Sequence, residues 1–242
     1  MFGTRLVLPR KGRDEGEKPF WVSYADLMTA LMMLFLVVMA VSLFAVTSRG
    51  DRHEKDISNC MREFEAMAKA TQDEYVKVDV ANRRVSFGER ARFANKDCNL
   101  SLESAQRLRT FTPVVLRFAD SACGRKLLKR VVVEGYTSKT GSYLFNLDLS
   151  LKRAHSVLCA LFDDPALGEN ALSHDQKLAI RKLFLVGGYS SNSGKGTDEE
   201  SRRVELKLEF WGLDDKEKAP VVASDETSPL GNCMLGRHAI AN

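Results

Sequence analysis

The sequence is poor in the residues that most often carry catalysis. It has only four histidines, and it contains neither a Gly-x-Ser-x-Gly nor a His-Glu-x-x-His motif. The histidines are scattered without the spacing of metal ligands: His53, His155, His174 and His238. An enzyme is therefore the weakest interpretation, and we expect neither a metal site nor a cofactor. The net charge is only +4 and is spread along the chain, which argues against direct binding of nucleic acid.

Cysteine is scarce, and its placement is uneven. All five cysteines follow the apolar segment of residues 27–46, and their spacing matches no metal site: Cys60, Cys98, Cys123, Cys159 and Cys233. If this part of the chain lies in an oxidising compartment, one or two disulfides are expected, with the pairing left open. The odd number leaves at least one free thiol or an intermolecular bond.

Charge is absent from residues 27–46, where Thr29 and Ser42 are the only polar residues. At 1.5 Å per residue, this stretch forms about 30 Å of helix, the thickness of the hydrocarbon core of a bilayer. We therefore predict a transmembrane helix over residues 20–48. A cleaved signal peptide is disfavoured, because the apolar stretch is too long and no clear small-x-small cleavage site follows it.

The flanks of this helix predict its orientation. Residues 1–19 are basic and are expected in the cytoplasm by the positive-inside rule: they contain Arg5, Arg10, Lys11, Arg13 and Lys18. Arg49 and Arg52 follow the helix, but a folded domain is translocated largely regardless of such charges. We expect a bacterial inner-membrane protein whose C-terminal domain is periplasmic.

Asp26 is the one acid in the predicted membrane helix. A carboxylate there costs at least about 2.5–3.5 kcal/mol, so it normally faces a protein interior or a water-filled path. Low dielectric favours the neutral acid, which allows proton uptake and release near neutral pH. Ser23, Tyr24 and Thr29 are the candidate neighbours along such a path. The alternative is an interfacial acid near the helix start, where the helix dipole favours an anion.

The residues around Asp26 resemble a known family. Phe20-Trp21-Val22-Ser23-Tyr24-Ala25-Asp26-Leu27-Met28-Thr29-Ala30 is similar to the start of the membrane helix in MotB-type stator subunits. The resemblance implies that Asp26 carries the translocated ion, with a proton expected and sodium as the alternative. It also implies that two copies of the chain sit inside a ring of five MotA-like subunits.

Residues 49–75 are highly charged but carry a stripe of apolar residues at spacings of three and four. The stripe predicts an amphipathic linker helix: it consists of Ile57, Cys60, Met61, Phe64, Met67 and Ala68. In flagellar stators this region contains a plug that blocks ion leak. A plain connector is the simpler interpretation, and the sequence leaves both open.

Residues 76–211 alternate between strand and helix patterns. The predicted strands are Val76–Val80, Arg83–Phe87, Arg130–Glu134, Phe184–Gly188 and Arg203–Phe210. The predicted helices are Ser101 to about Ala119, Tyr143–Phe162 and Ser173–Leu183. This order predicts an α+β domain, with a mixed sheet and helices packed on one face. Residues 212–242 show no periodicity and are expected to be a tail, either disordered or packed through Cys233.

The centre of this domain resembles the OmpA-like peptidoglycan-binding domain. The resemblance rests on Val133-Glu134-Gly135-Tyr136-Thr137, Gly141, Asn146, Leu149-Ser150, Arg153-Ala154 and Ser201-Arg202-Arg203-Val204-Glu205. It implies that the domain binds the zwitterionic peptide stem of peptidoglycan, with Arg153 on a carboxylate. The other binding residues implied are Thr137, Ser138, Asn146 and Leu149.

One position departs from the OmpA-like pattern. Where the family usually has an aspartate for the ammonium group, this chain has Ser138, followed by Lys139. Serine offers no charge to an ammonium and lysine repels it. Binding is therefore expected to be weaker, or to use Asp148 instead.

Among the motor families, the chain most resembles ZorB of the Zorya anti-phage system. This resemblance rests on Lys18–Met39, Gly141–Leu144 and Arg181–Leu185. It implies a ZorA-like partner ring and a role in defence. A flagellar stator subunit and an OmpA-like envelope tether without ion flow remain as alternatives; the ExbD/TolR type lacks the OmpA-like motif.

Overall fold

The computed structural model describes residues 20–163, 171–192, 194–213, 215, 229–231 and 233, with only the backbone described at 20–23 and 90. The chain divides into two compact units, Met1–Arg52 and His53–Asn242. The basic residues 5–18, on which the orientation was predicted, and most of the tail 212–242 lie outside the described residues.

Helix α1 (Phe20–Lys69) begins in the first unit. Every side chain from Tyr24 to Thr47 is exposed, and the most apolar part has a mean hydropathy of 2.6. By length and composition this helix can cross a membrane. The core helix of a soluble protein would bury such side chains, whereas these are exposed.

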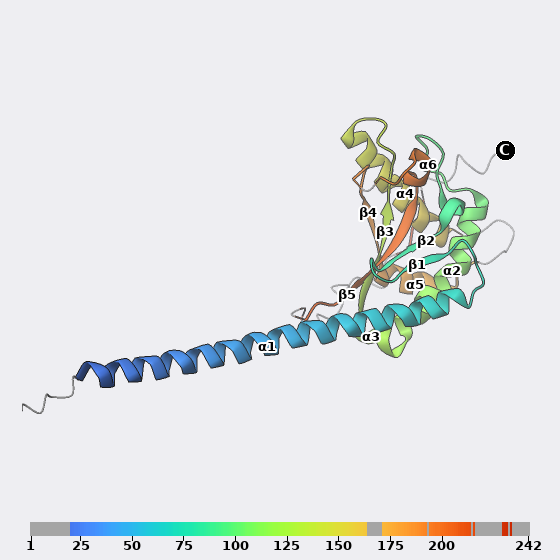
Figure 1. Ribbon diagram of the computed structural model, residues 1–242. Coiled ribbons are helices and arrows are strands. Elements are labelled where there is room, and N and C mark those ends of the chain that lie inside the picture. Colours follow the sequence, from blue (N-terminus) through green and yellow to red (C-terminus); the bar gives the residue numbers. More distant parts are fainter. Residues whose placement is uncertain are drawn as a thin grey trace, which may run out of the picture. The chain divides into compact units, whose positions relative to one another are not determined.

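The second unit is built on a five-stranded mixed sheet with the order β1-β2-β5-β3-β4 (Figure 1). Its strands are β1 (Lys77–Asp79), β2 (Arg84–Ser86), β3 (Leu128–Gly135), β4 (Phe184–Gly188) and β5 (Val204–Phe210). Only β3 and β4 are parallel; the other neighbours are antiparallel. Alternation along β3 and β5 places Val131 and Val133 opposite Leu208 and Leu206 in the core, while charged residues occupy the other face.

Helices fill the apolar side of this sheet, as the alternating pattern requires. They are α2 (Leu102–Asp120), α3 (Ala122–Leu127), α4 (Tyr143–Phe162) and α5 (His174–Leu183). The chain also forms the short α6 (Asp198–Ser201) and the 3₁₀ helix η1 (Gly88–Ala91). Serine caps begin the three long ones: Ser101 and Ser142 accept from backbone N–H groups three residues on, and Ser173 forms a capping box with Gln176. The α+β prediction, with helices on one face of a mixed sheet, is confirmed.

The C-terminal part of α1 is not a separate linker. Residues 53–69 belong to the second unit, and their apolar stripe lies in its core: Ile57, Cys60, Met61, Phe64 and Ala68 are buried. The Phe64 ring lies 4.8 Å from the Phe118 ring, centroid to centroid, and a disulfide joins Cys60 to Cys123. An amphipathic helix must bury its apolar stripe, and here the domain itself provides the partner.

The described cysteines form two disulfides and leave one free thiol, as the odd number suggested. The pairs are Cys60–Cys123 and Cys159–Cys233, and Cys98 is free. The predicted strands and the predicted helices Ser101 to about Ala119, Tyr143–Phe162 and Ser173–Leu183 agree with the structure to within two residues. The predicted helices 20–48 and 49–75 are instead one continuous helix, which ends at Lys69. The three shortest helices, η1, α3 and α6, were missed because four to six residues are too few to show a period.

Candidate functional site

Asp26 lies one and a half turns into α1, among exposed apolar side chains. Its backbone carbonyl accepts a hydrogen bond from Thr29 Oγ1 at 2.9 Å, so the proton of that hydroxyl is already used. Tyr24 is 51% exposed, and the side chain of Ser23 lies outside the described atoms. Within the described part of the chain, no side chain pairs with the Asp26 carboxylate. In a bilayer this acid therefore requires neighbours from another chain, or water.

Arg153 lies on α4 and is completely buried. Its Nε, Nη1 and Nη2 donate to the backbone carbonyls of Asp97 (2.9 Å), Tyr136 (2.8 Å) and Ala94 (3.0 Å). The guanidinium also lies 5.0 Å from the centroid of the Phe93 ring. Burial, followed by the nearby charge of Arg202, lowers the pKa of Arg153 to about 10. The side chain thus braces the 93–97 segment against the end of β3.

The other residues predicted to bind peptidoglycan lie just after β3 and in the first half of α4. Thr137, Ser138, Asn146 and Leu149 are all buried. The Thr137 backbone N–H donates to the Ser190 carbonyl at 3.0 Å. The Thr137 hydroxyl is buried and has no hydrogen-bond partner among the described residues. A buried polar group of this kind is usually satisfied by a water or a ligand.

This geometry changes what is expected of two residues. The guanidinium of Arg153 donates hydrogen bonds to three backbone carbonyls of the protein itself, two of them in the 93–97 segment. Its contact with a carboxylate of peptidoglycan therefore stays a prediction, and it requires the 93–97 segment to move. Asp148, the alternative for the ammonium group, forms an ion pair with Lys152 at 2.8 Å on the exposed surface of α4, where it raises the pKa of Lys152.

The face of the sheet opposite the core carries a network of charged residues that the sequence did not predict as a site. The Glu134 carboxylate is fully buried, where it accepts from Arg84 and, at 2.6 Å, from the Tyr136 hydroxyl. Arg84 also donates to Glu205 at 3.0 Å, and Arg203 Nε donates to Glu205 at 2.7 Å. A cavity of about 490 Å³ opens beside this network. Its sequence signal is weak: charged residues alternate along β5 as Glu205, Lys207 and Glu209, but they do not alternate along β3.

Burial and charge shift the proton affinities in this network. Burial, and then the hydrogen bond to Glu134 and its charge, raise the pKa of Tyr136 above its usual range. Burial alone raises the pKa of Glu205, but the hydrogen bond and charge of Arg203, with help from Lys195 and Arg84, outweigh it and lower that pKa. The network therefore holds Glu205 as a carboxylate and Tyr136 as a phenol.

Comparison with known proteins places these features in a family. A family model described as the membrane MotB of the proton-channel complex MotA/MotB matches residues 9–48, which include Asp26. Among solved structures, a putative MotB-like protein from Desulfovibrio vulgaris is 16% identical, with a TM-score of 0.41 over 65% of this chain and 99% of that one.

Two curated relatives match along most of their length. The Zorya protein ZorB of Escherichia coli O139:H28 is 45% identical over 223 residues, 89% of this chain and 90% of the relative. A second Zorya protein ZorB, from Escherichia coli ATCC 8739, is 28% identical and covers 83% of this chain and 91% of its own. This sets aside the flagellar alternative. The chain belongs to the family of the Zorya protein ZorB, as a MotB-like subunit of a Zorya system.

Proposed function

We propose that Asp26 carries the ion, expected to be a proton, through a membrane motor in which this chain is the stationary subunit. The observation that carries the proposal is a single acid in an exposed and predominantly apolar segment of α1, residues 24–47, inside the stretch that matches the MotB family model. The lone carboxylate is costly in lipid and becomes tolerable only against a partner subunit. Protonation and release at Asp26 then couple ion flow to movement of that partner.

The partner proposed is a ZorA-like ring of five subunits around two copies of this chain. The support is chemical: apart from Asp26 and a few hydroxyl groups, side chains 24–47 are apolar, and all of them are exposed. A surrounding ring and a second copy of the chain can therefore cover this segment on every side. Tyr24, Thr29 and Ser23 are proposed to line the ion path beside Asp26. The helix itself is proposed to span residues 20–48.

Two disulfides support the proposed orientation. Both lie after the apolar segment, in the second unit, and disulfides persist in oxidising compartments such as the periplasm. We place residues 1–19 in the cytoplasm and residues 76–211, with the packed end of α1, in the periplasm. The protein is then an inner-membrane protein of bacteria.

The periplasmic unit is proposed to hold the chain still by binding peptidoglycan. The support is the cluster at the start of α4, where the buried Thr137 hydroxyl lacks a partner in the described structure. Ser138 follows Thr137 in sequence, and Asn146 and Leu149 lie on α4. Arg153, on the same helix, donates to the carbonyl of Tyr136, the residue before Thr137. A purified cell-wall sedimentation assay tests this step: Thr137→Val, which keeps the shape and removes the hydroxyl, is expected to weaken binding, and equal binding would refute the role of this cluster.

Phage plating on cells carrying the native operon tests the motor. Asp26→Asn keeps the size of the side chain and removes its titratable proton, so plaque formation is expected to return to the level of cells without the operon. The matched control is Asp51→Asn, an exposed acid on the same helix outside the apolar stretch, which is expected to leave protection intact. Protection that survives Asp26→Asn, at normal membrane levels, would favour a passive envelope tether instead.

A further inference from the structure

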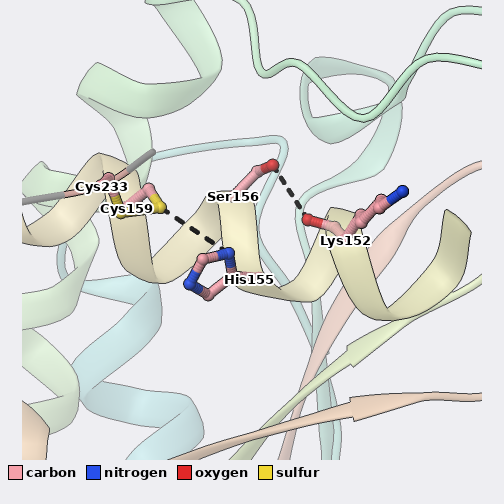
Figure 2. Close-up of a disulfide and its surroundings, with 5 residues drawn as sticks. All are labelled: Lys152, His155, Ser156, Cys159 and Cys233. Carbon is pink, nitrogen blue, oxygen red and sulfur yellow. Dashed lines mark hydrogen bonds between the residues drawn. A yellow bond between two sulfur atoms is a disulfide. The ribbon is translucent and has the colours of Figure 1, made fainter. Parts of the chain in front are cut away.

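The disulfide between Cys159 and Cys233 has a third metal-ligating side chain beside it. His155 lies one turn before Cys159 on α4, and its Nδ1 is 3.9 Å from Cys159 Sγ (Figure 2). The ligand atoms of His155, Cys159 and Cys233 all lie within 4.8 Å of one another. By contrast, Cys60 of the other disulfide lies in the hydrophobic core.

We propose that these three side chains form a redox-dependent zinc site, which binds Zn²⁺ when Cys159 and Cys233 are reduced and cannot bind it while they form the disulfide. Zinc takes cysteine sulfur at about 2.3 Å and histidine nitrogen at about 2.0–2.1 Å. A tetrahedral ion therefore separates a sulfur ligand from a nitrogen ligand by about 3.6 Å and two sulfur ligands by about 3.8 Å. The observed 3.9 Å between Nδ1 and Sγ lies within about 0.3 Å of the first of these separations.

Only one ligand has to move when the bond opens. His155 and Cys159 are four residues apart on one helix, so both share a face and are held by α4. Cys233 lies outside any helix or strand and is half-buried, so its sulfur can move the small distance that the ion requires. His155 is exposed, which leaves the fourth position of the ion to water.

The chemistry balances with a dithiol as the reductant. An external dithiol transfers two electrons to the Cys159–Cys233 bond and becomes a disulfide itself, which leaves two protein thiols. Zn²⁺ then displaces the two thiol protons and binds the two thiolates and the neutral imidazole, because thiolate is the ligand form of cysteine. In the reverse exchange an external disulfide accepts two electrons and two protons and becomes a dithiol, while the Cys159–Cys233 bond re-forms and releases Zn²⁺.

Cobalt titration of the full-length protein in detergent tests the site. The protein is reduced with a phosphine, the phosphine is removed without air, and Co²⁺ is added. We expect a one-to-one complex with visible ligand-field bands and a near-ultraviolet thiolate charge-transfer band, both abolished by Zn²⁺. The oxidised protein is expected to show neither band.

Three variants separate this site from the other thiols. His155→Ala is expected to weaken Co²⁺ binding by roughly 10-fold or more, since loss of even an outer partner of a ligand costs 10–100-fold. His174→Ala, at the first residue of α5, and Cys60→Ala/Cys123→Ala are the controls and are expected to retain the bands.

Several results would overturn the proposal. These are no thiolate band in the reduced protein, equal affinity in His155→Ala, or a band that persists in Cys159→Ala/Cys233→Ala. Circular dichroism is recorded alongside: a reduced chain that loses its fold and does not regain it with Zn²⁺ also counts against the site, whereas refolding on Zn²⁺ that depends on His155 supports it.

Discussion

The two ends of the continuous helix α1 differ in which of their side chains are exposed. From Tyr24 to Thr47 every side chain is exposed, and the only acid is Asp26. From His53 to Lys69 charges are frequent, but one stripe is buried in the domain, with Met61 and Phe64 completely inaccessible. The first end is apolar around its whole circumference, and the second is apolar along one stripe.

This difference shows that the distribution of apolar residues around a helix, rather than their number, predicts what the helix contacts. An all-round apolar surface needs lipid or a surrounding ring of protein, and an acid within it stands out as costly. A one-sided stripe needs a single partner, which here is the domain that follows it in sequence. The predictions below test the packing of the second end of α1 and then the contacts of the domain in which it is buried, in order of decreasing effect.

The largest effect is expected from Phe64→Ala. Phe64 is fully buried between the rings of Phe111 and Phe118, so its truncation leaves a cavity and is expected to lower the free energy of unfolding of the domain by about 3–5 kcal/mol. The matched control is Phe44→Ala, since Phe44 is 75% exposed at the other end of the helix. Urea unfolding in detergent measures the free energy of unfolding of both variants. An equal decrease in the two would contradict the claim that only the second end of α1 packs in the domain.

Removal of the Cys60–Cys123 disulfide tests how firmly the second end is held. The two cysteines are 63 residues apart, and loops of that size lie between the roughly 3 kcal/mol expected for 15 residues and the 4.7 expected for 100. We expect Cys60→Ala/Cys123→Ala to cost about 4 kcal/mol and to speed amide hydrogen exchange between residues 53 and 69. Unchanged exchange there would show that packing alone holds this end to the domain.

Arg153→Lys distinguishes a brace from a ligand-binding group. The single ammonium group of a lysine cannot reach all three carbonyls. With two hydrogen bonds lost at about 1 kcal/mol each, we expect a loss of about 2 kcal/mol without any peptidoglycan present. Arg125→Lys, on the exposed surface of α3, is the control and is expected to be neutral. If Arg153→Lys kept full stability and lost only wall binding, the bracing role would be wrong.

The smallest effect concerns Glu205 and depends on pH. Because the pKa of Glu205 is lowered in the folded state, its contribution is complete above the unfolded carboxyl pKa, near 4.3, and is lost as the pH falls further through the folded value. Glu205→Gln is expected to cost about 1.5 kcal/mol at pH 7 and progressively less below about pH 4. The exposed Glu89, changed in the same way, is the control. A gap between Glu205→Gln and the wild type that stays constant down to pH 2 would contradict the assignment.

Local patterns in the sequence predicted much of this structure. The predicted helix Tyr143–Phe162 has the observed bounds, and two other predicted helices begin at Ser101 and Ser173, the residues that cap α2 and α5. Capping and periodicity are readable because both depend on neighbours within four residues. Asp26 was found because charge in an apolar run is a local signal as well.

What the sequence could not predict depends on residues far apart in the chain. The carbonyls of Asp97 and Ala94, which accept from Arg153, are 56 and 59 residues away, and no local pattern marks a carbonyl as an acceptor. Glu134 and Arg84 meet only because β5 lies between β3 and β2 in the sheet. The pairing of the cysteines likewise follows from the fold rather than from spacing.

The most direct test of the central claim is proton flux through the purified complex of this chain and its ring partner in liposomes, followed with a pH-sensitive dye under an imposed potential. The account predicts flux with wild-type protein and with Asp51→Asn, and none with Asp26→Asn, at equal amounts of assembled complex. Flux that continues in Asp26→Asn would contradict the claim that the ion passes by way of this carboxyl group.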